Sequence, residues 1–141
     1  MKELILCISI IFIIGTLVLF ETSCKKGPGS GGRATIKGKV WTRKHDIGYT
    51  VVLNEYNSTD EPVYIIYGNE VNYGDKVSTN YNGEYEFQYL RKGSYKIYVY
   101  SSDSAAIRDG NATAPKVAVV KEINIADKKE TVDAGTLIVL H

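Results

Sequence analysis

The sequence predicts an all-β fold, a single antiparallel β-sandwich of about seven strands that follows an N-terminal signal segment. Three observations lead to this prediction. From residue 34 onward, short runs of β-branched and aromatic residues are broken by glycine, asparagine and aspartate, as in strands joined by turns. Within these runs apolar and polar side chains alternate, which is the period of a half-buried strand. No stretch has the spacing of an amphipathic helix of useful length.

The clearest elements are two strands within residues 81–100. Asn82-Gly83 supplies a turn that needs a positive φ, and a second turn falls at Lys92-Gly93. Around these turns, alternation places Tyr85, Phe87, Tyr95, Ile97 and Val99 in the core, and Leu90 is expected to close the end of the sandwich. The opposite face carries Glu84, Glu86, Lys96, Tyr98 and Tyr100.

Five more strands are expected along the rest of the chain. They fall at residues 35–42, 49–53, 63–67, 117–125 and 131–140. About seven short strands separated by turn-rich loops favour two packed sheets over a closed barrel. The core must supply the stability, because the two cysteines, Cys7 and Cys24, both precede the predicted domain and leave it without disulfides or a cysteine metal site.

The first 23 residues have the features of an export signal. Lys2 gives a charged start, residues 4–20 are almost entirely apolar, and Thr22-Ser23 are small residues directly before Cys24. This arrangement resembles a bacterial lipoprotein signal. The resemblance implies cleavage after residue 23 and attachment of acyl chains such as palmitate to Cys24. The alternative is that the apolar run stays uncut as a membrane anchor.

The remainder divides into a tether and one domain. Residues 24–33 comprise the lipidated cysteine and a glycine-rich stretch, KKGPGSGGR, whose composition is typical of a flexible tether. Residues 34–141 form the predicted sandwich. The lipid signal implies a cell-envelope protein anchored to the outer membrane, and the lack of an acidic run after Cys24 favours the periplasmic face over the cell surface.

Several segments of the domain resemble the prealbumin-like sandwiches, especially carboxypeptidase regulatory-like modules. They are residues 36–40 (IKGKV) and 79–87 (TNYNGEYEF), followed by Leu90, Gly93 and Tyr95. The resemblance extends over residues 34–140. It implies a transthyretin-like fold and a non-catalytic accessory role, such as spacing, adhesion or sugar binding beside another activity.

Composition and motifs argue against several functions. With 17 basic and 16 acidic residues, the chain has no excess of positive charge for a nucleic-acid partner. His45 lies in a charged turn and His141 is the last residue, and no nucleophile motif, metal-ligand set or cofactor motif accompanies them. We therefore predict a protein without catalytic residues, metal or cofactor, and keep a hydrolase with an unrecognised site as the weakest alternative.

Two small motifs lie in residues 101–111. Asp103, Asp109 and Asn111 offer oxygen ligands, but their spacing matches no EF-hand loop, so a helix cap and a turn are favoured over a calcium site. Asp103-Ser104-Ala105 resembles the short motif that some bacteria O-glycosylate on exported proteins, which makes Ser104 a candidate modification site.

Aromatic side chains out of phase with the core are the candidate ligand contacts. Sugars stack on exposed rings, and the candidates are Trp41, Tyr89, Tyr98 and Tyr100. The sequence therefore leaves two main hypotheses. The first is a membrane-tethered, non-catalytic lipoprotein module with a structural or partner-binding role, and the second is a carbohydrate-binding lipoprotein.

Overall fold

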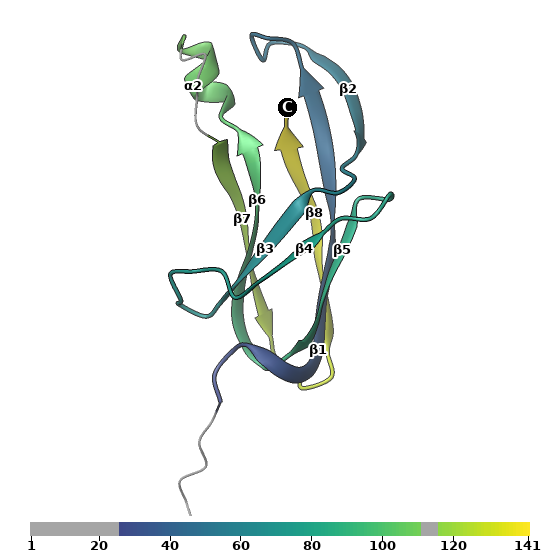
Figure 1. The fold of residues 1–141 in the computed structure, drawn as a ribbon, viewed down its shortest axis with the longest axis vertical. Helices are drawn as coiled ribbons and strands as arrows, with labels where there is room; N and C mark the ends of the chain where they lie inside the picture. The colour runs from purple at the N-terminus through teal and green to yellow at the C-terminus, as the bar shows by residue number, and fades with distance from the viewer. Residues whose placement is uncertain (1–25, 111–115) are drawn as a thin grey trace, which may run out of the picture.

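Two β-sheets packed face to face make up the described part of the chain (Figure 1). The structure is a computed structural model that describes residues 26–110 and 116–141. The first sheet contains β1 (Ser30–His45), β2 (Val52–Asn57), β5 (Glu84–Leu90) and β8 (Thr131–Leu140). The second contains β3 (Pro62–Tyr67), β4 (Asp75–Ser78), β6 (Gly93–Ser102) and β7 (Lys116–Ile125). The predicted all-β sandwich is confirmed, with eight strands in place of about seven.

The long strand β1 organises the first sheet. On one side it pairs with β5 along its first part and with β2 along its second part, both antiparallel. On its other side β1 pairs with β8 in parallel, an exception to the antiparallel pairing that the sequence predicts. The second sheet is antiparallel throughout, in the order β4-β3-β6-β7. Parallel pairing needs a long connection between the two strands, and the strands of the second sheet lie in the chain between β1 and β8.

The core lies between the two sheets and consists of side chains from both. The buried apolar residues are Ala34, Ile36, Val40, Val63, Ile65, Tyr85, Phe87, Leu90, Tyr95, Ile97, Val99, Ile123, Ile125, Ala134, Leu137 and Val139. All five residues that alternation assigns to the core in residues 81–100 are among them, and so is Leu90. Gly83 has φ 75°, and a Cβ there would lie 2.5 Å from the Val40 carbonyl oxygen, so the predicted turn requires glycine.

The glycine-rich segment is packed against the domain for part of its length. β1 begins at Ser30, inside the stretch 24–33 that composition assigns to a flexible tether. Gly29 is buried, and its N–H donates to the Tyr95 hydroxyl at 3.0 Å. A Cβ on Gly32 would lie 1.9 Å from the Leu90 carbonyl oxygen. Glycine is needed here because the backbone passes too close to the end of β5 for a side chain.

The second strand starts later than the sequence predicts. β2 covers Val52–Asn57, whereas the apolar pattern indicates residues 49–53. The Asp46 carboxylate explains the shift, because it accepts hydrogen bonds from the N–H groups of Thr50 and Val51 at 2.7 and 3.0 Å and holds residues 46–51 as a turn. The hydrogen bond from the Val51 N–H, followed by one from the Thr50 hydroxyl, lowers the pKa of Asp46. Within this turn Tyr49 has φ 51°, which a strand does not accommodate.

Two short elements have no clear signal in the sequence. β4 has four residues, three of them exposed, and therefore lacks an apolar period. The helix α2 (Ser104–Arg108) has a single turn and buries no residue. It begins at the predicted Asx-type cap, where the Asp103 carboxylate accepts hydrogen bonds from the N–H groups of Ala105 and Ala106, both at 3.1 Å.

Candidate functional site

Two of the candidate ligand contacts lie side by side on the outer face of the second sheet. Tyr95, Ile97 and Val99 of β6 point into the core, so the alternating residues Tyr98 and Tyr100 point outward. Their ring centroids are 5.5 Å apart, with planes nearly perpendicular at 84°. Tyr100 keeps 39% of its surface exposed.

Tyr64 and Tyr73 join this pair from other parts of the chain. Tyr64 of β3 stands directly opposite Tyr98 of β6, and the two rings stack with centroids 5.0 Å apart and planes 12° from parallel. Tyr73, from the loop between β3 and β4, meets Tyr64 edge-on at 5.1 Å. Tyr100 also meets Tyr64 edge-on, at 5.8 Å. We call Tyr64, Tyr73, Tyr98 and Tyr100 the tyrosine cluster.

The cluster combines an apolar surface with several hydroxyl groups. Val120 of β7, which is 51% exposed, pairs with Tyr98 and extends the apolar surface sideways. Two residues further along both strands, Lys96 and Glu122 form an ion pair 3.9 Å apart at the border. Burial, followed by the neighbouring Tyr100, raises the pKa of Tyr98, so its hydroxyl is protonated at neutral pH. Such a surface suits stacking contacts and hydrogen bonds with an uncharged partner.

The sequence alone could not bring these four rings together. Alternation in β3 places Tyr64 on the outer face, but its position opposite Tyr98 depends on the register of two strands separated by a long stretch of chain. Tyr73 lies outside any strand pattern. The glycines that flank its loop are the available signal: Gly68 has φ 58°, and Gly74 passes so close to Tyr67 that a Cβ would lie 2.3 Å from the ring.

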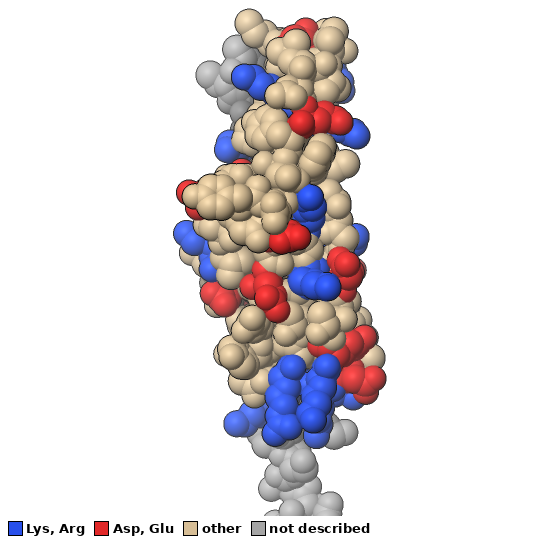
Figure 2. Space-filling view, turned by 90° about the vertical axis from the view of Figure 1, so that its right-hand side faces the viewer, with Lys and Arg blue, Asp and Glu red and all other residues tan. Residues whose placement is uncertain are grey.

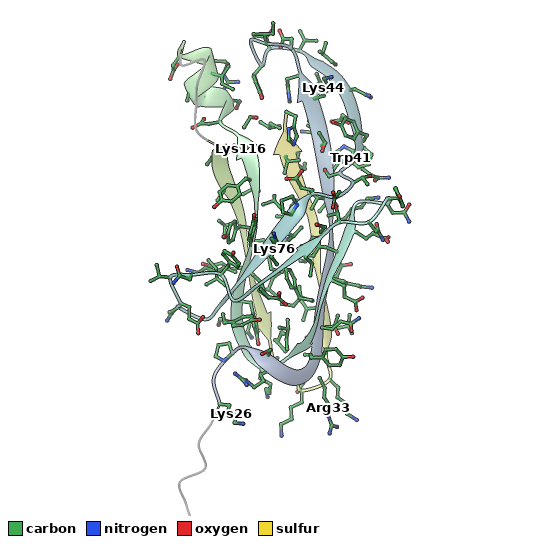
Figure 3. The ribbon with its side chains drawn as sticks, in the orientation of Figure 1. Lys26, Arg33, Trp41, Lys44, Lys76 and Lys116 are labelled. Atoms are coloured by element: carbon green, nitrogen blue, oxygen red, sulfur yellow. The ribbon has the colours of Figure 1, made fainter. Side chains whose placement is uncertain are left out.

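The other two candidate contacts lie elsewhere. Trp41 points outward from β1 in the first sheet, half-buried, with the Lys39 ammonium 5.7 Å from its ring centroid (Figure 3). Tyr89 lies near the end of β5 in the same sheet, with φ 58° and 68% of its surface exposed. The four predicted rings therefore do not form one site, because Trp41 and Tyr89 belong to one sheet while Tyr98 and Tyr100 face outward from the other.

The two histidines lie at one end of the sandwich and are held by local contacts. The His45 N–H donates to the His141 carbonyl oxygen at 2.7 Å, and the His45 ring stacks on Tyr49 with centroids 5.3 Å apart. The His141 Nε2 lies 3.9 Å from the Glu61 carboxylate. Within residues 26–110 and 116–141, no three histidine, cysteine, aspartate or glutamate side chains are grouped so that they could hold a metal ion.

The remaining sequence candidates are placed as follows. Ser104 is the first residue of α2 and is partly exposed. Cys24, the predicted lipid-attachment residue, and Asn111, one of the alternative calcium ligands, lie outside the described residues. In the part of the chain that the structure describes, no helix is long and apolar enough to span a bilayer.

Comparison with known proteins gives matches in structure and none in sequence. No protein-family model matches the chain. No match is found among curated proteins. A candidate carbohydrate-binding protein from Pseudomonas aeruginosa aligns with 80% of this chain and 91% of its own, at 11% identity and a TM-score of 0.46. (S)-allantoin synthase aligns with 79% of this chain at 12% identity and a TM-score of 0.38, and the match spans 42% of the synthase.

Proposed function

We propose that this chain is a non-catalytic, membrane-tethered module of the cell envelope, prealbumin-like in fold, that binds a partner through the tyrosine cluster. The observation that carries the proposal is the position of four tyrosine rings on the outer face of a sheet whose other face already supplies the core. An exposed set of aromatic rings is the composition that protein interfaces favour, because each ring gives a large contact area at a low cost in conformational entropy.

The exposed members of the cluster are the expected contacts. Tyr73 and Tyr100 keep 54% and 39% of their surface accessible, and each packs edge-on against Tyr64. Rings that are held by their neighbours lose little conformational entropy on binding. Less of the free energy gained from their contacts is therefore offset by ordering the side chains. Tyr64 and Tyr98 cover each other by stacking and act as the support for the two exposed rings.

Photo-crosslinking in living cells tests this surface. Tyr73 and Tyr100 are replaced one at a time by a photo-reactive phenylalanine analogue, and crosslinked products are compared on a gel. Tyr81, in the turn before β5, and Tyr56 of β2 are matched controls, because they are 88% and 43% exposed and lie outside the cluster. The proposal predicts a discrete product from the two cluster positions alone. Equal labelling from all four positions, or none from Tyr73 and Tyr100, would contradict it.

Carbohydrate is the second candidate partner, and the exposed tyrosine rings favour it. Sugar rings stack on aromatic faces while the hydroxyl groups exchange hydrogen bonds, and the cluster offers both kinds of contact. A glycan array decides between the two candidates. Binding that falls at least tenfold in Tyr73→Ala and Tyr100→Ala, and that Tyr81→Ala leaves unchanged, would identify a sugar site. An array without any binding would rule this candidate out.

The membrane attachment is tested separately. We propose that Cys24 carries acyl chains after removal of residues 1–23, and that the domain faces the periplasm from the outer membrane. Cells grown with a palmitate analogue should label the wild-type chain and leave Cys24→Ala unlabelled. An unlabelled wild type would refute the lipid anchor, whereas labelling that persists in Cys24→Ala would place the acyl chain elsewhere.

A further inference from the structure

Basic side chains gather at the end of the sandwich where the described chain begins. β1 starts here, and the β5–β6 and β7–β8 connections lie at the same end. Together they line an open groove. We call the cations around it the basic end, which consists of Lys26, Arg33, Arg91, Lys92, Lys128 and Lys129. Figure 2 shows Lys and Arg side chains clustered at this end of the surface.

The six cations of the basic end outnumber the acidic side chains of the groove, because Asp127 is the one carboxylate among its lining residues. All of its cations except the half-buried Arg91 are exposed. Among the described residues, the ion pairs lie elsewhere, as with Arg43 and Glu55 of the first sheet or Lys96 and Glu122 of the second. Glu130 is next to Lys129 in sequence, but its carboxylate accepts hydrogen bonds from the N–H groups of Ala126 and Asp127. It therefore stabilises the β7–β8 connection. The basic end therefore presents a local positive field on a nearly neutral chain.

The basic end is also fixed close to the predicted lipid-attachment residue. The Arg91 side chain donates from Nε to the Gly27 carbonyl oxygen at 2.7 Å, and the Arg91 N–H donates to the Gly29 carbonyl oxygen at 2.9 Å. Gly27 is thus held on the domain, only three residues after Cys24. Three residues span at most about 11 Å when fully extended. An anchor at Cys24 would hold the basic end within about one Debye length of the headgroups.

An exposed tyrosine, Tyr89, lies two residues before Arg91 in the sequence. Near the end of β5, a β-bulge inserts one extra residue relative to β1, because Phe87 pairs with Ile36 and Leu90 with Ala34. Both residues between Phe87 and Leu90, Gln88 and Tyr89, are exposed. Tyr89 directly precedes Leu90, which pairs with Ala34, the residue after Arg33. Its φ of 58° is unusual for an aromatic residue. Tyrosine next to lysine and arginine is the composition found where proteins meet the headgroup layer.

We propose that the basic end is a docking surface for anionic phospholipid headgroups, which holds the sandwich upright on the membrane that anchors it. This rests on the proposed anchor at Cys24. The long axis of the domain runs away from the basic end, and Lys44 and Lys116 lie at the opposite end (Figure 3). Docking would therefore leave the outer faces of both sheets, including the tyrosine cluster, free beside the membrane for a partner.

The test compares the full chain, purified from membranes, in lipid nanodiscs of two compositions. One contains phosphatidylcholine alone, and the other contains about one-third phosphatidylglycerol. Hydrogen exchange is followed in residues 91–93 and 126–130. We expect exchange in both connections to slow several-fold in the anionic discs, and the difference to disappear in about 0.5 M NaCl because salt screens the charges. Equal exchange in the two compositions would overturn the docking surface.

Matched variants separate this effect from a general change in charge. Each basic residue near an anionic surface contributes about fivefold to binding, so Lys92→Gln/Lys128→Gln/Lys129→Gln should lower the ratio of docked to undocked chains by about 100-fold. Lys44→Gln/Lys76→Gln/Lys116→Gln removes the same charge away from the basic end and should keep the protection (Figure 3). Loss of protection in both triple variants would mean that overall charge, and not this surface, is responsible.

Flotation with vesicles distinguishes failure of the docking surface from failure of the anchor. Neutral vesicles report on the anchor alone, because headgroups without net charge do not attract the basic end. A chain that floats with neutral vesicles but shows no lipid-dependent protection retains the anchor and refutes the docking surface. A wild-type chain that floats only with anionic vesicles refutes the anchor. If the Lys92→Gln/Lys128→Gln/Lys129→Gln variant does not float with them, the docking surface is supported. A chain that floats with neither kind of vesicle refutes both.

Discussion

Tyr64 of β3 and Tyr98 of β6 stand directly opposite each other across the second sheet and stack, with ring centroids 5.0 Å apart. This cross-strand pair supports the two exposed rings of the tyrosine cluster, because Tyr73 and Tyr100 both pack edge-on against Tyr64. The pair therefore has two consequences. It contributes to the stability of the sheet, and it fixes the shape of the surface that we propose as the binding site.

The energetic coupling within this pair is measurable. A double-mutant cycle with Tyr64→Leu and Tyr98→Leu should give a coupling free energy of about 1 kcal/mol, because stacked aromatic rings contribute that much beyond their buried area. Urea unfolding of the wild type, both single variants and the double variant supplies the four values. If the effects of the two substitutions add to within about 0.3 kcal/mol, the rings do not stabilise each other as the geometry indicates.

The Tyr95 hydroxyl connects the start of the described chain to the end of the sandwich. It accepts a hydrogen bond from the Gly29 N–H at 3.0 Å and donates one to the Arg91 carbonyl oxygen at 2.6 Å. Tyr95→Phe keeps the ring in the core but leaves both groups without this partner, so the free energy of unfolding should fall by about 1–3 kcal/mol. Hydrogen exchange at residues 27–30 should become faster. Unchanged exchange there would show that the segment is held by other contacts.

Two glycines of the same segment should respond differently to alanine. A Cβ on Gly32 would lie 1.9 Å from the Leu90 carbonyl oxygen, whereas nothing lies within 4 Å of a Cβ on Gly27. Gly32→Ala should therefore lower the free energy of unfolding by about 2 kcal/mol or more, and Gly27→Ala by less than about 0.5 kcal/mol. Thermal unfolding measures both. Equal effects would mean that the segment up to Arg33 is a free tether after all.

The buried Tyr85 hydroxyl should make the stability of the domain depend on pH in the alkaline range. It has no hydrogen-bond partner among the described residues, and burial, with a smaller effect of Asp133, raises the pKa of Tyr85 above its usual value of 10.0. The folded state holds this proton more tightly than the unfolded state, so the contribution of Tyr85 to stability should be constant below about pH 10 and fall above it.

Tyr85→Phe isolates this contribution. The variant loses no hydrogen bond, so at neutral pH it should be as stable as the wild type or more stable by about 1 kcal/mol. Its stability should also fall less steeply above about pH 10, with the remaining slope due to Tyr67, Tyr95 and Tyr98, whose pKa values burial also raises. Unfolding curves across this pH range decide the point. A variant with the wild-type slope would show that Tyr85 ionises equally in both states.

Local signals in the sequence are sufficient to predict the strands that carry the core. The Asn82-Gly83 turn is confirmed by the φ of 75° at Gly83, and Tyr85 and Phe87 are buried as alternation requires. These features depend on the period of one strand and the chemistry of one turn, so each can be read from neighbouring residues.

Features that depend on distant contacts could not be predicted in the same way. The start of β2 is displaced by the Asp46 carboxylate, whose hydrogen bonds to Thr50 and Val51 compete with the strand pattern. The tyrosine cluster needs the register between β3 and β6 and the contact between Tyr73, in the β3–β4 loop, and Tyr64. Alternation identifies Tyr98 and Tyr100 as outward-facing, but it does not indicate that Tyr64 and Tyr73 join them, or that Trp41 and Tyr89 lie elsewhere.

Hydroxyl-radical footprinting of intact envelopes is the most direct test of the tyrosine cluster as a contact surface. Oxidation of each tyrosine is compared between the purified chain and the chain in its native membrane. In the structure Tyr73, Tyr100 and Tyr81 are 54%, 39% and 88% exposed, so all three should be oxidised in the purified chain. In envelopes we expect Tyr73 and Tyr100 to be protected several-fold and Tyr81 to react as before. Equal oxidation of Tyr73 and Tyr100 in the two samples would contradict a partner-binding role for this surface.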